Sequence, residues 1–176
     1  MVRHATADDA ARCAEIYLPN VRDGVASLEE DPPGAEEMAA RIARITRTHP
    51  WLVDEHDGEL AGYAYGSPHH DRAAYRWSTD VTVYVAGEHR RKGVGRRLYA
   101  HLFELLRGQN LFVACAGVTL PNEASVGLHE ALGFEPVGVY RRVAWKFGEW
   151  WDVGWWQLQL LPAGAERPAE PMFPNP

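Results

Sequence analysis

The sequence predicts an α/β fold, with one domain in which a mixed central sheet carries helices on both faces. Three observations support this prediction. A length of 176 residues suits one domain with a sizeable core. Hydrophobic residues make up 46% of the chain and charged residues 24%, as in ordinary globular proteins. Strand-like and helical periodicities follow one another as strand, two helices, three strands, helix, strand, helix and two strands.

The first part of the chain predicts a short strand, two helices and a hairpin. The expected elements are a strand over residues 2–5, a helix opening at Thr6, a loop over residues 20–34, a helix over residues 35–48 and strands over residues 51–55 and 60–65. Asp9 follows Thr6 by three residues, which is close to a capping box. Pro50 prevents the second helix from continuing. Asp57-Gly58 is typical of a hairpin turn.

The remaining elements end in a proline-rich segment. They are a polar loop over residues 67–72, a strand over 77–85, a loop over 87–95, a helix over 94–107, a strand over 111–119, a helix from Asn122 to Gly133 and strands over 140–147 and 151–160. The continuous apolar run at 111–119 is typical of a buried strand. In the helix from Asn122, the stripe expected to pack inward is Ala124, Leu128, Ala131 and Leu132. We expect a domain over residues 1–161 and a tail over residues 162–176, which contain five prolines.

Charge and cysteine usage narrow the possible functions. A net charge of −6 argues against general nucleic-acid binding. Cys13 and Cys115 lie far apart and form no CxxC motif, which predicts reduced, buried thiols in a cytoplasmic protein. No signal peptide or membrane-spanning segment is expected. The neighbouring His69, His70 and Asp71 have no second ligand cluster in the sequence, so we expect no metal site.

The most informative segment joins a strand to a helix through a basic, glycine-rich loop. The strand VTVYV at residues 81–85 precedes the pattern Arg90-x-x-Gly93-x-Gly95. Glycines allow successive N–H groups to converge, and a helix N-terminus adds partial positive charge, so this loop predicts a pyrophosphate site. Charge for further phosphates would come from Arg90, Arg91, Lys92, Arg96 and Arg97. A basic, solvated loop before an ordinary helix is the alternative interpretation.

Two further places carry candidate chemistry. Asn122 is a good N-cap, and Asn122, Ser125 and His129 line one stripe of the following helix, although such a stripe can simply be exposed surface. Asp80 begins the central strand. A carboxylate in a partly dry cleft is a candidate general base, but an Asp at a strand end also serves in turns and ion pairs.

The strand with its Arg90–Gly95 loop resembles the acetyl-CoA pyrophosphate loop of the GNAT superfamily of N-acetyltransferases. Within that superfamily the chain is most similar to phosphinothricin N-acetyltransferases, in segments that include 50–53, 62–65, 74–77, 82–85, 120–126, 128–133 and 152–157. The match runs over about residues 2–160. The resemblance implies a single domain with a mixed, mostly antiparallel sheet, acetyl-CoA as cosubstrate and, often, a homodimer.

The resemblance also assigns roles on the cofactor side. It implies that Val83, Tyr84 and Val85 pair with pantetheine, and that a backbone N–H near Val85 holds the thioester oxygen. It implies that the phosphates lie against Arg90, Arg91, Lys92, Gly93, Val94, Gly95 and Arg96, and that Asn122 and Ser125 touch CoA. His129 would protonate or hydrogen-bond the departing thiolate, since an unperturbed pKa of ~6.5 suits transfer near neutrality.

The sequence departs from the resemblance mainly on the acceptor side. The family's catalytic carboxylate, normally Glu, falls on Asp80, and a side chain one methylene shorter retreats roughly 1.5 Å from the amine. Arg72 and Tyr75 match substrate-contacting positions, whereas Leu28 stands where Phe is usual. The resemblance implies acetylation of a small amino-acid-like amine such as phosphinothricin, methionine sulfoximine or methionine sulfone. The alternatives are another acceptor (a polyamine, an aminoglycoside or a protein N-terminus) or a catalytically weak acyl-CoA-binding sensor.

Overall fold

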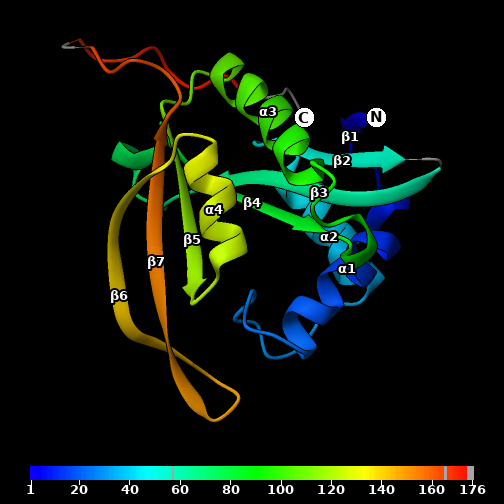
Figure 1. Ribbon diagram of the computed structural model, residues 1–176. Helices are drawn as coiled ribbons and strands as arrows, with labels where there is room; N and C mark the ends of the chain where they lie inside the picture. Colours follow the sequence, from blue (N-terminus) through cyan, green and yellow to red (C-terminus); the bar gives the residue numbers. More distant parts are fainter. Residues whose placement is uncertain (57, 165, 174–176) are drawn as a thin grey trace.

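A seven-stranded sheet in the order β1-β2-β3-β4-β5-β7-β6 forms the centre of the computed structural model (Figure 1). The structure describes residues 1–56, 58–164 and 166–173. The strands are β1 (Val2–His4), β2 (Trp51–His56), β3 (Glu59–Pro68), β4 (Ser78–Val85), β5 (Val113–Leu120), β6 (Glu135–Lys146) and β7 (Glu149–Gln159). Neighbouring strands run antiparallel except β4 and β5, which are parallel. The expected mixed, mostly antiparallel sheet is confirmed.

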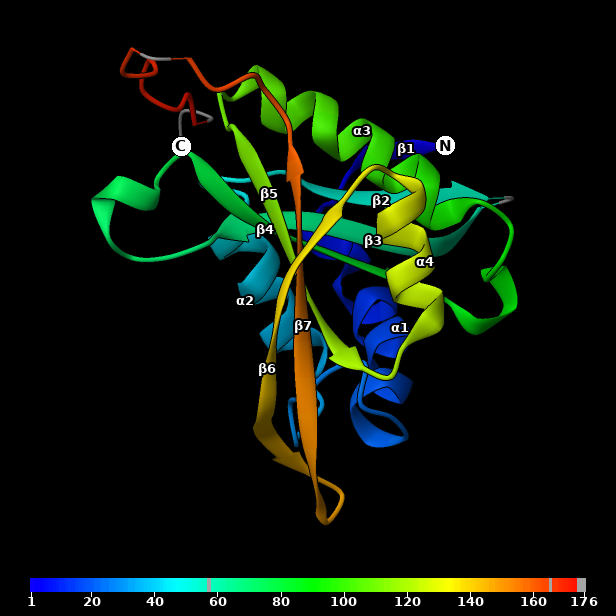
Figure 2. The ribbon, with the colours of Figure 1, turned by 60° about the vertical axis from the view of Figure 1, so that its left-hand side comes forward.

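Helices cover both faces of this sheet, as the sequence predicted (Figures 1 and 2). They are α1 (Ala10–Arg22), α2 (Ala35–Ile45), α3 (Val94–Gly108) and α4 (Glu123–Ala131). Alternate residues of β2 enter two separate cores, with Leu52 packed in the core that contains α3, and Trp51 and Val53 in the core that contains α1 and α2. Leu98 and Leu102 of α3 are fully buried, and burying each side chain contributes about 1.5–3 kcal/mol.

Several boundaries differ from the expected ones because tertiary contacts extend an element. Helix α1 continues through Pro19 to Arg22, where buried Val21 anchors its last turn, so the expected loop begins later than residue 20. Strand β6 begins at Glu135 because its first residues pair with β7. In the first hairpin turn Gly58 has φ +80°, which suits glycine, while Asp57 lies outside the described residues.

The segment expected to be a tail lies against the body of the molecule. Residues 162–164 and 166–173 form no helix or strand, and residues 165 and 174–176 of the expected tail lie outside the described residues. Trp77 Nε1 donates to the Ala169 carbonyl at 2.8 Å, and Arg76 Nε pairs with Glu170 at 2.6 Å. The Phe173 ring centre is 5.6 Å from that of His49. The proposed boundary at residue 161 stays a prediction.

The β6–β7 hairpin extends past the rest of the sheet (Figures 1 and 2). Many of its large side chains are exposed, among them Val137, Tyr140, Val143, Trp145, Phe147 and Trp150. Trp156, in contrast, is buried in the core beside α3. Core packing therefore accounts for part of the tryptophan-rich segment, while Trp145 and Trp150 face outward and Trp151 and Trp155 are half-buried. Within the described ranges, no helix is both long and apolar enough to span a membrane.

Candidate functional site

The two parallel strands β4 and β5 separate part-way along their length. Their pairing spans Ser78–Asp80 on β4 and Val113–Cys115 on β5. Strand β4 then continues to Val85 beside β3, while β5 continues to Leu120 beside β7. The facing edges of β4 and β5 beyond Asp80 and Cys115 therefore diverge, which opens a gap in the middle of the sheet.

A cleft of about 730 Å³ lies at this gap. Its walls come from β4, β5, the loop before α3, α3 itself and α4, and the residues include Val83, Tyr84, Val85, Arg90, Arg91, Gly93, Val94, Gly95, Arg96, Gly117, Asn122, Ser125 and His129. Val81 and Val83 belong to the core on the α3 side, whereas Tyr84 packs with the α1 side. Since Asn20 and Ala26, from the α1 side, also line the cleft, it reaches both faces of the sheet.

The loop before α3 ends in a geometry suited to an anion. Gly93 is the N-cap of α3 with φ +77°, and Arg91 also has a positive φ of 60°. The Arg97 N–H donates to the Gly93 carbonyl at 3.0 Å, so the three preceding amides stand at the open N-terminus, where helical acceptors are lacking. These amides and the helix dipole favour negative charge at this end of the cleft.

Gly95 is required for close packing and not for the backbone freedom that the sequence suggested. It is buried, and a Cβ at this position would lie 3.1 Å from Leu128 Cδ2 and 3.9 Å from Val83 Cγ2. Its φ is outside the left-handed region, in contrast to that of Gly93. Glycine at position 95 therefore allows α3 and α4 to approach each other beside the cleft, and Gly93 supplies the unusual backbone conformation.

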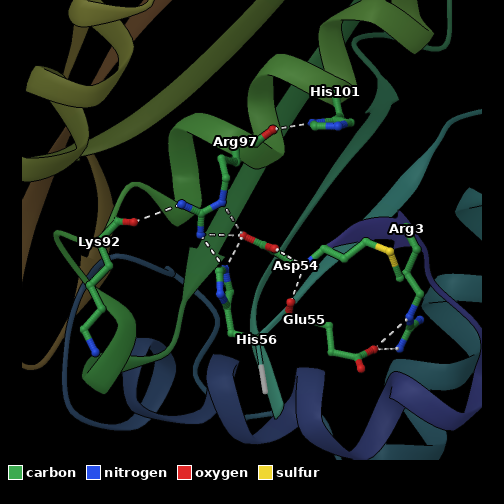
Figure 3. A network of polar contacts seen from close by, with 8 residues as sticks. Arg3, Asp54, Glu55, His56, Lys92, Arg97 and His101 are labelled. Atoms are coloured by element: carbon green, nitrogen blue, oxygen red, sulfur yellow. Dashed lines mark hydrogen bonds and ion pairs between the residues drawn. The ribbon is translucent and has the colours of Figure 1, made fainter. Parts of the chain in front are cut away.

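Arg97 is held away from the cleft by a buried carboxylate (Figure 3). Its Nε and Nη2 donate to Asp54 Oδ2 at 3.0 and 2.8 Å, and its Nη1 donates to the Lys92 carbonyl at 3.0 Å. Burial alone would raise the pKa of Asp54, but the bonds from Arg97, the N-terminal amine and His56 together outweigh it and lower that pKa. Arg97 therefore braces the glycine-rich loop instead of adding charge for a phosphate. The Lys92 side chain is exposed and, unlike the other predicted cofactor residues, does not line the cleft.

His129 is buried, in contrast to the exposed polar stripe that its neighbours suggested. Its Nδ1 donates to the Ser125 carbonyl at 2.7 Å, and its Nε2 accepts from the Tyr99 hydroxyl at 3.1 Å. Burial lowers the pKa of His129, and the bond to Ser125 opposes this shift. The imidazole is therefore neutral near pH 7, and the expectation that His129 keeps an unperturbed pKa near 6.5 is wrong.

The alanines of helix α4 face the cleft and not the core, in contrast to the sequence prediction. Asn122 Oδ1 accepts from the Ser125 N–H at 3.1 Å, so the predicted N-cap is confirmed. Ala124 and Ala131, expected to pack inward, are exposed and line the cleft. The reason is that α4 lies over the gap between β4 and β5 on this side, instead of packing on a continuous sheet.

Asp80 lies where the gap begins, on the face opposite α3. Its neighbours Thr79 and Val81 are buried, and Asp80 alternates with them toward the other face of β4. Asp80 Oδ1 accepts a hydrogen bond from His69 Nδ1 at 2.6 Å. Burial raises the pKa of Asp80, while His69 opposes the shift. A carboxylate with a raised pKa beside a cleft suits acid–base chemistry.

Of the other predicted acceptor residues, Tyr75 lies against His69, the partner of Asp80. Tyr75 is exposed, with its ring centre 5.9 Å from that of His69 and stacked 4.9 Å from that of His70. Arg72 is exposed, and its backbone N–H donates to His70 Nδ1 at 3.1 Å. Leu28 is half-buried in the loop between α1 and α2. The structure thus brings Tyr75 to the His69–Asp80 pair, and it leaves the roles of Arg72 and Leu28 as predictions.

Two buried residues in or near the site were not predicted from the sequence. Tyr99 is fully buried in α3 and contacts His129. Lys146, at the end of β6, is also buried, and its Nζ donates to the carbonyls of Val21, Gly24 and Ser27 at 2.6, 3.0 and 2.8 Å. Lys146 thereby holds the loop that carries Ala26 and Leu28. Its partners are 119 to 125 residues away, so no local pattern could have indicated it.

Comparisons with known proteins agree on one family. Residues 2–155 match the model of the acetyltransferase (GNAT) domain. The chain is 37% identical to a phosphinothricin N-acetyltransferase of Streptomyces viridochromogenes, over 97% of this chain and 93% of the relative. It is 36% identical to an L-methionine sulfoximine/L-methionine sulfone acetyltransferase of Pseudomonas paraeruginosa, over 92% and 95%.

A solved structure shows the same architecture. It is a GNAT superfamily phosphinothricin acetyltransferase from Sinorhizobium meliloti in complex with acetyl-CoA. It superposes with a TM-score of 0.92 at 34% sequence identity, over 99% of this chain and 96% of that one. The likeness therefore extends over nearly the whole of both chains.

Proposed function

This chain belongs to the GNAT family of acetyltransferases and uses acetyl-CoA, and we propose that it acetylates the amine of a small amino-acid-like molecule. The acceptor class is that of phosphinothricin, methionine sulfoximine and methionine sulfone, which the names of its relatives contain. One observation carries the proposal. A single cleft reaches both faces of the sheet, with an anion site at one end and a carboxylate beside the other.

The cofactor side of the proposal uses residues that line the cleft. The open amides at the start of α3, together with Arg90, Arg91 and Arg96, would hold the phosphates of CoA. The separated edge of β4 from Val83 to Val85 would pair with pantetheine, and Asn122 and Ser125 would contact the same arm. A backbone N–H near Val85 would stabilise the oxyanion, and one such donor contributes about 3 kcal/mol.

At the other end of the cleft, two buried groups would surround the departing sulfur. His129 and Tyr99 both line the cleft and hydrogen-bond each other. Because His129 is neutral, the pair would stabilise the thiolate through hydrogen bonding and relay to it the proton that the acetylated amine loses as CoA leaves. Asp80 would draw the amine to the opposite face, where Arg72 and Tyr75 would bind the acidic group and the body of the substrate.

The test is turnover with a panel of amines. With saturating acetyl-CoA, the purified chain should release free thiol with phosphinothricin, methionine sulfoximine or methionine sulfone. A polyamine, an aminoglycoside and a peptide N-terminus serve as competing acceptors. Preference for one of these would replace the proposed acceptor class. Binding of acetyl-CoA without turnover on any amine would instead indicate an acyl-CoA-binding sensor.

We further propose a cytoplasmic homodimer. Cys13 and Cys115 are both free thiols, which suits a reducing compartment. The edge strand β6 carries exposed apolar side chains, among them Tyr140, Val143 and Trp145, and an uncovered apolar surface at a sheet edge invites another chain. Sedimentation velocity should give a dimer for the chain and a monomer for Trp145→Glu. A monomeric parent chain would contradict this assembly.

A further inference from the structure

His69 and Asp80 form a hydrogen-bonded pair in which the second ring nitrogen of His69, Nε2, is free within the described part of the chain. The Nδ1–Oδ1 distance is 2.6 Å. A carboxylate accepts hydrogen bonds, so His69 Nδ1 carries the proton, and Nε2 of the neutral ring then holds a lone pair. Among the described residues, none hydrogen-bonds Nε2, and the His69 side chain is 26% exposed. The pair therefore presents an available base beside the cleft.

We propose that His69, oriented by Asp80, is the group that takes the proton from the acceptor amine, an inference that rests on the proposed function. On this proposal the carboxylate of Asp80 need not reach the substrate. Its side chain, shorter than that of Glu, leaves room for the imidazole. The ring of His69 then lies between the carboxylate and the substrate amine. Asp80 then acts as a positioning residue, and His69 is the catalytic one.

The position of His69 relative to the cleft supports this assignment. Cys115 pairs with Asp80 across the β4–β5 register, and Gly117 lies two residues further along β5 on the same face. A Cβ at Gly117 would lie 3.3 Å from the Trp155 ring, and the centre of that ring is 5.9 Å from His69. Gly117 lines the cleft. His69 therefore packs against Trp155, and Trp155 packs against Gly117 in the cleft wall.

The neighbouring groups leave His69 as the base. Cys115 offers a sulfur within 4.8 Å of the His69 and Asp80 ligand atoms. Burial and the nearby Asp80 raise the pKa of Cys115 to about 11, so the thiol stays protonated near neutral pH. Oδ1 of Asp80 already accepts the hydrogen bond from His69, so on this proposal Asp80 orients the imidazole. The other rings that face His69 are those of Tyr75 and Trp155, and the Trp155 indole is a donor only.

The proposed step balances in protons and bonds. One N–H bond of the substrate ammonium breaks, and its proton moves to His69 Nε2, where Asp80 stabilises the imidazolium. The amine lone pair forms a C–N bond with the thioester carbonyl carbon, and the C–S bond then breaks. The second amine proton goes to the departing thiolate to give CoA. His69 releases its proton to water and returns to the neutral form.

The decisive experiment is a reciprocal pair of substitutions, compared by steady-state kinetics with the best amine of the panel. His69→Ala should lower kcat by about 100-fold, in the range for loss of a general base. Asp80→Glu should also lower kcat, because the longer carboxylate collides with the imidazole. The double variant His69→Ala/Asp80→Glu should regain at least 10-fold over either single variant, since the glutamate can reach the amine in place of the ring.

Controls separate this inference from the proposed function and from misfolding. His101→Gln removes an exposed helix histidine and should leave kcat unchanged. Unchanged acetyl-CoA affinity by calorimetry would show that each variant is folded. If the parent chain acetylates the amine but His69→Ala keeps kcat within threefold, or the double variant gains nothing, His69 is not the base. If the parent chain acetylates no amine, the proposed function itself fails.

Discussion

The hydroxyl of Tyr99 in α3 donates to Nε2 of His129 in α4, with 3.1 Å between the two atoms and both side chains buried. Accepting this bond requires an unprotonated Nε2, so the contact favours the neutral imidazole together with burial, whereas the bond from Nδ1 to the Ser125 carbonyl opposes it. The contact links the two helices that line the cofactor side of the cleft. It therefore adds to burial in keeping neutral the residue expected beside the sulfur of CoA.

Tyr99→Phe should raise the pKa of His129. The phenol stabilises the neutral ring, so its removal favours the charged form, although burial still opposes it. NMR titration of the His129 ring protons should give a midpoint below ~6.5 in the parent chain and a higher midpoint in the variant. An unchanged or lower midpoint would mean that the hydroxyl does not govern this histidine.

Acid should destabilise the fold through His49. This residue is 3% exposed, and burial lowers its pKa to about 4, whereas the unfolded chain has a value near 6.5. Between these values the unfolded state binds a proton that the folded state does not. The free energy of unfolding should therefore fall as pH drops from about 6.5 to 4, by at most about 3 kcal/mol.

Chemical denaturation at several pH values measures the His49 effect. His49→Gln should flatten the curve over this window, and His101→Gln, at an exposed position, should not. Equal slopes in the parent chain and His49→Gln would assign the acid sensitivity to other groups.

Gly93→Ala should weaken CoA binding more than Gly93→Asn. Gly93 has φ +77°, a conformation that costs alanine about 1–2 kcal/mol and that asparagine tolerates better. We expect the alanine variant to lose roughly 5- to 30-fold in CoA affinity by calorimetry if the strain is relieved by distorting the loop. Similar affinities for the two variants would show that binding does not depend on the left-handed conformation.

Arg96 and Arg97 should give opposite results although they are adjacent in sequence. Arg96 is exposed and lines the cleft, so Arg96→Met should lower CoA affinity, most at low ionic strength, and change stability by less than about 0.5 kcal/mol. Arg97→Met removes the nearest of the three partners of buried Asp54 and should reduce stability by about 2 kcal/mol, less than for a fully buried pair because Arg97 is partly exposed and the N-terminal amine and His56 remain. Calorimetry and urea denaturation of both variants provide the comparison. Equal effects of the two would contradict this division of roles.

Lys146→Met should destabilise the chain and loosen the acceptor side of the cleft. Methionine keeps an unbranched apolar chain but leaves the carbonyls of Val21, Gly24 and Ser27 without their donor, which we expect to reduce stability by about 2–3 kcal/mol. Because this loop carries Ala26 and Leu28, KM for the amine should rise while KM for acetyl-CoA stays near its parent value. A rise in both constants would point to a general loss of structure.

Local patterns in the chain were sufficient for most of the elements, for the glycine-rich turn before α3 and for the cap of α4. The loop from Arg90 to Gly93 and the cap at Asn122 were predicted because their interactions join residues a few positions apart, where turn and capping preferences act. The resemblance to GNAT acetyltransferases, drawn from the same segments, is confirmed by the family match over residues 2–155.

Contacts between distant segments decided the rest, on the cofactor side as well as on the acceptor side. His69 meets Asp80 across 11 residues, Tyr99 meets His129 across 30, and Arg97 meets Asp54 across 43. Each contact follows from strand register and helix packing, which depend on the burial of the whole core, so no nearby pattern marks the partner. The same holds for the separation of β4 and β5, which opens the cleft and gives Asp80 its environment.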